Sequence, residues 1–153
     1  MTRKSRTAGP GLIALAAFAL IVLPAREVRS QGDKPSPLEG AWKQVEQKNG
    51  DAQEYRKVPD GAEMINLITG GRFVWTVVSQ GKVVAAAGGK YTADGEKYAE
   101  IIEYVAGQGV PESFVGSTFD FTCKVDGNIL HKVGTIQVNG QDFKIDEKWE
   151  RCK

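Results

Sequence analysis

The stretch FDFTCKVDGNILHKVGTIQVNGQDFKIDEKWER, residues 119–151, decides the fold. Apolar and polar residues alternate through most of it with a period of two, as they do in β-strands that bury one face. The turn sequences at 126–128 (Asp-Gly-Asn) and 139–140 (Asn-Gly) interrupt the alternation, and they mark tight hairpin turns because these residues tolerate positive φ. The stretch therefore predicts three consecutive antiparallel strands, over 117–125, 129–138 and 142–151.

The same pattern continues toward the N-terminus. We expect further strands at 40–47, 62–68, 72–79, 82–92 and 97–105, and a shorter strand can form near 52–57. No stretch has a long helical period, and the segment 106–115 has room for at most one turn of helix. Sequential hairpins at this spacing predict an all-β fold: a single antiparallel up-and-down β-barrel of about eight strands, because closure removes the exposed edges of the sheet.

The first thirty residues have the layout of an export signal. Basic residues at positions 3, 4 and 6 precede the apolar run 11–23, which is shorter than the roughly 20 residues of a membrane span. We expect cleavage after Ala25 or Ser30, and hence an exported protein, periplasmic or secreted, with no transmembrane segment in its mature chain. Residues 31–37 then form a flexible lead-in, and residues 38–153 form the barrel domain.

Charge and length limit the partners. Without residues 1–30 the chain has 15 Lys and Arg against 18 Asp and Glu, a net charge of −3. The basic residues are spread singly and form no basic face that could follow phosphates, so nucleic acid is not an expected partner. The 123 residues that remain suffice for one domain with one core.

Alternation along the last three strands assigns an inner face. We expect it to contain Phe119, Phe121, Cys123 and Val125, then Ile129, His131, Val133 and Thr135, then Phe143, Ile145, Glu147, Trp149 and Arg151. The charged residues left outside are Lys124, Lys132, Lys144, Asp146, Lys148 and Glu150. This register follows the charge pattern and requires three-residue loops, although Asn139-Gly140 suits a two-residue turn better. A slip of one residue would turn one strand inside out.

The expected inner face mixes aromatic with charged side chains. An eight-stranded barrel can fill its interior or hold one small ligand, and buried charge is costly unless it is paired or hydrated. We therefore expect a pocket for a small hydrophobic or amphipathic molecule, without a cofactor. The candidate ligand-binding residues are Trp75, Tyr98, Glu100, Tyr104, Phe121, His131, Glu147 and Trp149, of which the aromatic ones can equally fill a core.

Both ends of the expected barrel resemble a known superfamily. Gly40-x-Trp42 in the first strand and Glu147-x-Trp149-x-Arg151 in the last resemble the calycins, which include the lipocalins and the fatty-acid-binding proteins. The stretches GGKYTADGEKYAEIIEY (88–104) and IDEKWER (145–151) resemble bacterial exported lipocalin-like domains of uncharacterised function. The resemblance covers residues 38–151. It implies that Arg151 stacks over Trp42 to close the barrel and that Gly40 lets the chain pass close to the ring, although Arg151 could instead clamp a ligand carboxylate.

Two other function classes stay open. An isomerase- or hydrolase-like enzyme would use Glu100 with Glu147 as acid and base, or Cys123 with His131 as nucleophile and base. A filled barrel would serve as a protein-interaction or envelope structural module and would carry an apolar patch outside.

Histidine and cysteine numbers limit metal and disulfide chemistry. His131 is the only histidine, so a multi-histidine metal site is excluded, and no metal site is expected. Export permits a disulfide between Cys123 and Cys152, but the expected register places a strand between them.

Overall fold

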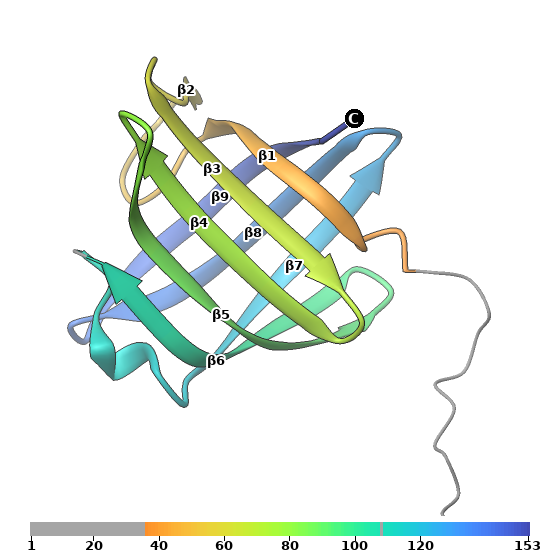
Figure 1. Cartoon of the computed structure of the whole chain (residues 1–153). Coiled ribbons are helices and arrows are strands. Elements are labelled where there is room, and N and C mark those ends of the chain that lie inside the picture. The colour runs from red at the N-terminus through yellow and green to blue at the C-terminus, as the bar shows by residue number, and fades with distance from the viewer. Residues whose placement is uncertain (1–35, 108) are drawn as a thin grey trace, which may run out of the picture. The chain divides into compact units, whose positions relative to one another are not determined.

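The computed structural model describes residues 36–107 and 109–153, so the expected export signal and almost all of the lead-in lie outside the described residues. Nine strands and one short 3-10 helix are present in the described part (Figure 1). Their bounds are β1 (Gly40–Gln47), β2 (Arg56–Lys57), β3 (Ala62–Thr69), β4 (Arg72–Ser79), β5 (Lys82–Asp94), β6 (Lys97–Gly107), η1 (Glu112–Phe114), β7 (Thr118–Asp126), β8 (Ile129–Val138) and β9 (Gln141–Arg151).

The sheet closes on itself. Strands β3 to β9 pair in chain order, and β1 pairs with β3 on one side and with β9 on the other. Eight antiparallel strands thus wrap into an up-and-down barrel, visible in Figure 1, while β2 only adds a two-residue pairing to the end of β1. The predicted fold class is confirmed.

Two-residue turns set the register of the last three strands. Asn139 and Gly140 both have positive φ, 53° and 77°, as in a type I′ turn, whose twist matches that of paired strands. Gly127, with φ of 57°, opens the other two-residue turn. Because each turn holds only two residues, Val138 faces Gln141 and Asp126 faces Ile129.

The register predicted for β8 is therefore wrong by one residue. Leu130 and Lys132 are buried, and Lys132 lies opposite Cys123 of β7 and Glu147 of β9. The predicted inward residues of this strand, Ile129, His131, Val133 and Thr135, lie on the outer face with partly or largely exposed side chains. The inward faces predicted for β7 and β9 agree with the buried Phe121, Cys123, Glu147 and Trp149.

A β-bulge corrects a second prediction. In the pairing of β5 with β6, Gly88 faces Tyr104 but Gly89 faces Ile102, so Glu103 is an extra residue on β6. The bulge reverses the alternation, and Tyr104 is 48% exposed instead of inward. Gly89 permits this close contact, because a Cβ there would lie 1.9 Å from the carbonyl oxygen of Ile101.

One end of the barrel is closed by the aromatic and cationic pair that the resemblance implied. Trp42 and Arg151 are direct partners across β1 and β9, and the guanidinium carbon lies 4.0 Å from the centroid of the indole ring. Arg151 donates hydrogen bonds to the carbonyl oxygens of Glu39 and Pro37, each at 2.7 Å. Gly40 has a φ of 140°, which favours glycine, and a Cβ there would lie 2.3 Å from a guanidinium nitrogen and displace it.

The buried core continues inward from Trp42. Its members are Leu38, Trp42, Ile68, Phe73, Tyr98, Ile102, Phe121, Cys123, Leu130 and Trp149. Both cysteines are free, Cys123 buried and Cys152 exposed. Within the described residues, no helix is long and apolar enough to cross a membrane.

Candidate functional site

A cavity of about 100 Å³ lies inside the barrel. It is placed toward the end where β8 turns into β9, where η1 also lies (Figure 1). The lining residues come from six strands and η1: Met64, Trp75, Glu100, Ile102, Phe114, Phe119, Phe121, Lys132, Ile136, Ile145 and Glu147.

The wall of the cavity is apolar toward the barrel end and charged further in. Phe114, Phe119, Ile136 and Ile145 are only partly buried and lie near strand ends or in η1. Phe114 and Phe119 pack edge to face, with ring centroids 4.9 Å apart. The partial exposure of these residues leaves the cavity open to solvent at this end of the barrel.

Three charged side chains form the inner part of the wall. Glu100, Lys132 and Glu147 are 2%, 6% and 5% exposed. Lys132 Nζ donates to Glu100 Oε1 at 3.0 Å, and it lies 4.3 Å from the centroid of the Phe121 ring. Burial by itself lowers the pKa of Lys132, but the charges of Glu100 and Glu147 outweigh burial and raise this pKa above its ordinary value. Lys132 is therefore a protonated ammonium group at neutral pH.

Glu147 is held differently from Glu100. Its Oε1 accepts a hydrogen bond from Asn49 Nδ2 at 3.0 Å, and Asn49 Oδ1 accepts one from the backbone N–H of Asp146 at 2.8 Å. Asn49 belongs to the connection between β1 and β2. This connection thus fixes the position of one carboxylate of the cavity.

Other buried polar atoms lie in the core, on residues that do not line the cavity. Four of them have no hydrogen-bond partner among the described residues: Gln44 Nε2, Asn66 Oδ1, Tyr98 Oη and Trp149 Nε1. Gln44 and Trp149 face each other across β1 and β9. Buried polar groups of this kind are ordinarily satisfied by ordered water or by a ligand.

The sequence-predicted ligand residues divide into three groups. Trp75, Glu100, Phe121 and Glu147 line the cavity. Tyr98 and Trp149 are buried in the core but are not part of the cavity wall.

The remaining two, Tyr104 and His131, lie outside the barrel. The alternation that placed them inside is broken by the bulge at Glu103 for Tyr104 and by the two-residue turns for His131.

On the outer face, His131 joins a hydrogen-bonded cluster. Asp146 Oδ1 lies 2.8 Å from His131 Nε2 and accepts a hydrogen bond from the Tyr55 hydroxyl at 2.5 Å. Lys48 Nζ lies 3.1 Å from Asp146 Oδ2, and Lys148 Nζ lies 3.9 Å from the centroid of the Tyr55 ring. The cluster fastens the β1–β3 connection, residues 48–61, against the outer face of β8 and β9.

The cluster shifts the acidity of two of its members. Partial burial by itself raises the pKa of Asp146, but hydrogen bonds from Tyr55, His131 and Lys48 outweigh it and lower this pKa to about 2. Burial, followed by the hydrogen bond to Asp146, raises the pKa of Tyr55 to about 12. Asp146 is thus ionised and Tyr55 is neutral at neutral pH.

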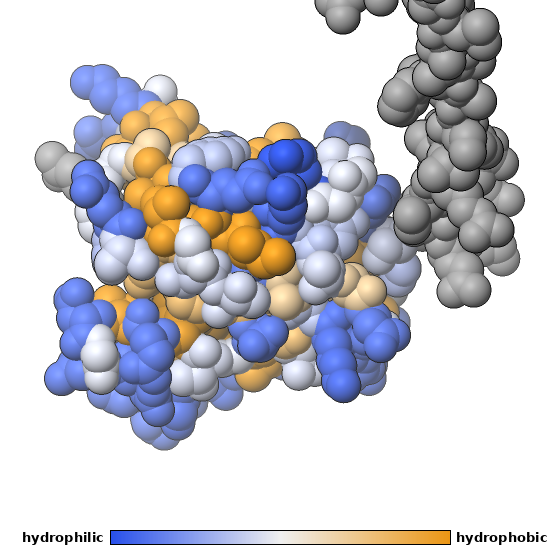
Figure 2. Space-filling model, turned by 90° about the horizontal axis from the view of Figure 1, so that it is seen from below, coloured by the Kyte–Doolittle hydropathy of each residue, from blue (hydrophilic) through white to orange (hydrophobic). Residues whose placement is uncertain are grey.

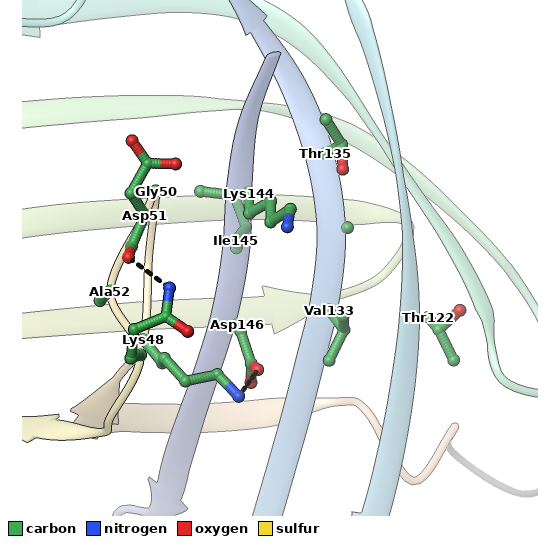
Figure 3. Close-up of a pocket in the computed structure, with 12 residues that line it drawn as sticks. Lys48, Gly50, Asp51, Ala52, Thr122, Val133, Thr135, Lys144, Ile145 and Asp146 are labelled. Atoms are coloured by element: carbon green, nitrogen blue, oxygen red, sulfur yellow. Dashed lines mark hydrogen bonds and ion pairs between the residues drawn. The ribbon is translucent and has the colours of Figure 1, made fainter.

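A larger hollow of about 530 Å³ lies beside this cluster on the outside of the barrel. Figure 3 shows Lys48 extending to Asp146 at its edge, with Thr122, Val133 and Thr135 on the neighbouring strands β7 and β8. The residues that line the hollow are either exposed or partly buried, and none of them is fully buried. The hollow therefore lacks the water-excluded polar groups that give a binding site its selectivity.

Apolar side chains also reach the outer surface. Val83 is 64% exposed, and Val84 and Val115 are exposed as well. Figure 2 shows apolar side chains on the underside of the molecule, bordered by hydrophilic ones. Exposed apolar residues of this kind are common on soluble domains and do not by themselves indicate a partner.

The arrangement contradicts the proposed pairing of Cys123 with His131. Cys123 points inward, opposite Lys132, while the His131 side chain is 42% exposed on the outer face. Burial is the main factor that raises the pKa of Cys123, to about 12, so the thiol is protonated and unreactive at neutral pH.

Sequence reasoning missed Lys132 and Asn49 as parts of the site. The charge of Lys132 predicts an outward side chain, whereas the two-residue turns at both ends of β8 direct it inward. Nothing in the sequence around Asn49 indicates that its amide reaches a carboxylate 98 residues further along the chain.

The chain is similar in structure to a lipocalin-like protein from Bacteroides uniformis ATCC 8492, with a TM-score of 0.49 and 17% sequence identity over 76% of this chain and all of that one. No protein-family model matches the sequence, and no curated protein does.

Proposed function

We propose that this protein binds a small, partly apolar ligand, or the end of a longer one, inside the barrel. One observation carries the proposal: a cavity with an aromatic and aliphatic wall ends on three buried charged side chains, Glu100, Lys132 and Glu147. A few placed polar groups in an apolar cavity are typical of ligand sites. A barrel that served only as a structural module would gain nothing from burying these charges.

The size of the cavity limits the ligand. Sites for drug-sized ligands measure about 300–1,000 Å³, and an apolar cavity of about 150 Å³ holds benzene. A cavity of about 100 Å³ accepts a group of about four heavy atoms and a polar head. Any longer ligand would extend past Phe114 and Phe119 into solvent.

We further propose that the protein acts outside the cytoplasm. Support comes from the layout of residues 1–30, a basic start, an apolar run and small residues at 25 and 30. Mass spectrometry of the protein purified from its own host should give a chain that starts at Arg26 or Gln31. A chain that retains residues 1–30 would contradict export with cleavage.

Binding is tested with 1-butanol as a minimal probe. We expect two-dimensional NMR titration of the full chain to shift the signals of cavity residues such as Ile102, Phe119 and Ile136, with a dissociation constant of roughly millimolar or weaker. Ile136→Trp should fill the cavity and abolish these shifts. Ile129→Trp, on the exposed face of the same strand, is the matched control and should retain them.

The proposal fails if 1-butanol leaves the cavity signals unchanged, or if Ile136→Trp and wild type respond alike. Shifts confined to Thr122, Thr135 and Lys144 would place binding in the outer hollow instead.

A further inference from the structure

Glu147 is a buried carboxylate that lacks a cationic partner in the described part of the chain. Its hydrogen bond there comes from the neutral amide of Asn49, at 3.0 Å. Lys132 lies opposite Glu147 in the sheet, but its ammonium group forms its ion pair with Glu100, at 3.0 Å. Within residues 36–107 and 109–153, no lysine, arginine or histidine nitrogen lies within 4.0 Å of the Glu147 carboxylate.

The charges of the cavity wall do not balance. The wall sets two carboxyl groups, those of Glu100 and Glu147, against the single ammonium group of Lys132. A buried carboxylate without an ion-pair partner is costly, because the hydrogen bond from Asn49 and the more distant charge of Lys132 only partly replace the water and the counter-charge that the group has lost. A cation in the cavity would restore the balance, whereas a ligand carboxylate would add a second unpaired negative charge.

We propose that the cavity selects a ligand that carries a protonated amine on a short apolar group, and that Glu147 binds the ammonium. The apolar part would lie against Phe119, Ile136 and Ile145, which line the same cavity. The inference rests on the proposed function and adds to it the chemical class of the ligand. Glu147 would provide a charge-assisted hydrogen bond in a site that excludes most water, where such bonds are strongest.

The test compares three probes with the same four-carbon chain: butylamine, 1-butanol and butyrate. The dissociation constant of each is measured by NMR titration of the full chain at neutral pH, on the signals of cavity residues. We expect butylamine to bind about tenfold more tightly than 1-butanol, and butyrate to bind more weakly than either.

Two variants of β9 assign the preference to one carboxylate. Glu147→Gln keeps the shape of the side chain and removes its charge, so butylamine and 1-butanol should then bind within about threefold of each other. Glu150→Gln removes one charge from the exposed face of the same strand and should keep the tenfold preference.

The other outcomes separate the amine preference, the role of Glu147 and ligand binding itself. If 1-butanol or butyrate binds in the cavity as tightly as butylamine, the amine preference is wrong while ligand binding stands. If the preference survives in Glu147→Gln, Glu147 does not bind the ammonium. If none of the three probes shifts a cavity signal, the proposed function itself is lost. The three-probe comparison on wild type remains decisive should Glu147→Gln fail to fold.

Discussion

Arg151 combines three contacts that no other cationic side chain could make together. Its guanidinium lies flat over Trp42 while two of its nitrogens donate to separate backbone carbonyls. The planar fork of arginine allows stacking and two directed hydrogen bonds at once, which an ammonium group cannot reproduce. The residue thus ties the chain before β1 to the last strand and closes this end of the barrel.

Arg151→Ala should lower the free energy of unfolding by about 2 kcal/mol, since it removes the stacking and both hydrogen bonds. Arg151→Lys should lose about half as much, because it keeps the charge but not the fork. Urea unfolding followed by tryptophan fluorescence measures both values. Arg56→Ala, at an exposed position of β2, is the control and should stay within about 0.5 kcal/mol of wild type. Equal stability of all four proteins would contradict a closing role.

Replacing Lys132 should lower the free energy of unfolding more than replacing Arg151. Lys132→Met leaves Glu100 and Glu147 buried without the ammonium group, and we expect a loss of about 3 kcal/mol in urea unfolding. Lys124→Met, on the outer face of β7, should change stability by less than about 0.5 kcal/mol.

The double variant Lys132→Met, Glu100→Gln tests the cause. It should recover part of the loss, because it also removes one stranded carboxylate. A double variant less stable than the sum of the single changes would show that charge balance is not the reason.

In strand β8, the length of the flanking turns and not the charge of Lys132 decides which face points inward. Its position and length were predictable from period two, but the choice between its faces depended on two competing signals. Lys132 favoured one face because charge prefers water, and Asn139-Gly140 favoured the other because a two-residue turn fixes the pairing. Backbone geometry prevailed because Glu100, far away in sequence, offsets the cost of burying the lysine.

The connection between β1 and β3 is an element held by side chains more than by pairing. Its two-residue strand β2 contributes little, and Tyr55, Asp146 and Lys48 supply the attachment. Tyr55→Phe removes one hydrogen bond, and we expect a loss of about 1 kcal/mol in local stability. Hydrogen exchange of residues 50–58 should accelerate about fivefold in the variant while exchange in β4 and β5 is unchanged. Uniform acceleration throughout the barrel would show that the contact supports the whole fold instead.

Acid should loosen the same element. The pKa of Asp146 is lowered in the folded protein to about 2, so its stabilising effect is present above pH 4 and is lost as the pH falls from about 4 toward 2. Asp146→Asn should therefore be less stable than wild type at pH 6, and the difference should shrink steadily below pH 4. Urea unfolding at a series of pH values measures it. Asp120→Asn, on the exposed face of β7, should show no such convergence, and a penalty for Asp146→Asn that is constant with pH would contradict the assignment.

For the whole molecule, the sequence predicted the architecture better than the site. Alternation and turn residues are local, so the strands, their order and their closure into a barrel could be inferred. The cavity depends on distances across the barrel. Trp75, Glu100, Phe121 and Glu147 face the interior as predicted because they keep simple alternation, whereas Tyr104 and His131 face outward where a bulge or a turn alters it.

The three buried charges of the interior, Glu100, Lys132 and Glu147, can serve either the stability of the barrel or the binding of a ligand. Replacing all members of a buried charged network by uncharged groups of similar size often leaves the free energy of unfolding unchanged or raises it. Removing only one partner lowers it strongly. The triple variant Glu100→Gln, Lys132→Met, Glu147→Gln should thus unfold in urea at the wild-type midpoint or above it, with an unchanged slope. It should also lose the preference for butylamine over 1-butanol. Such a result would mean that the three charges are kept for binding at no gain in stability. A triple variant much less stable than wild type would assign the network to the fold instead.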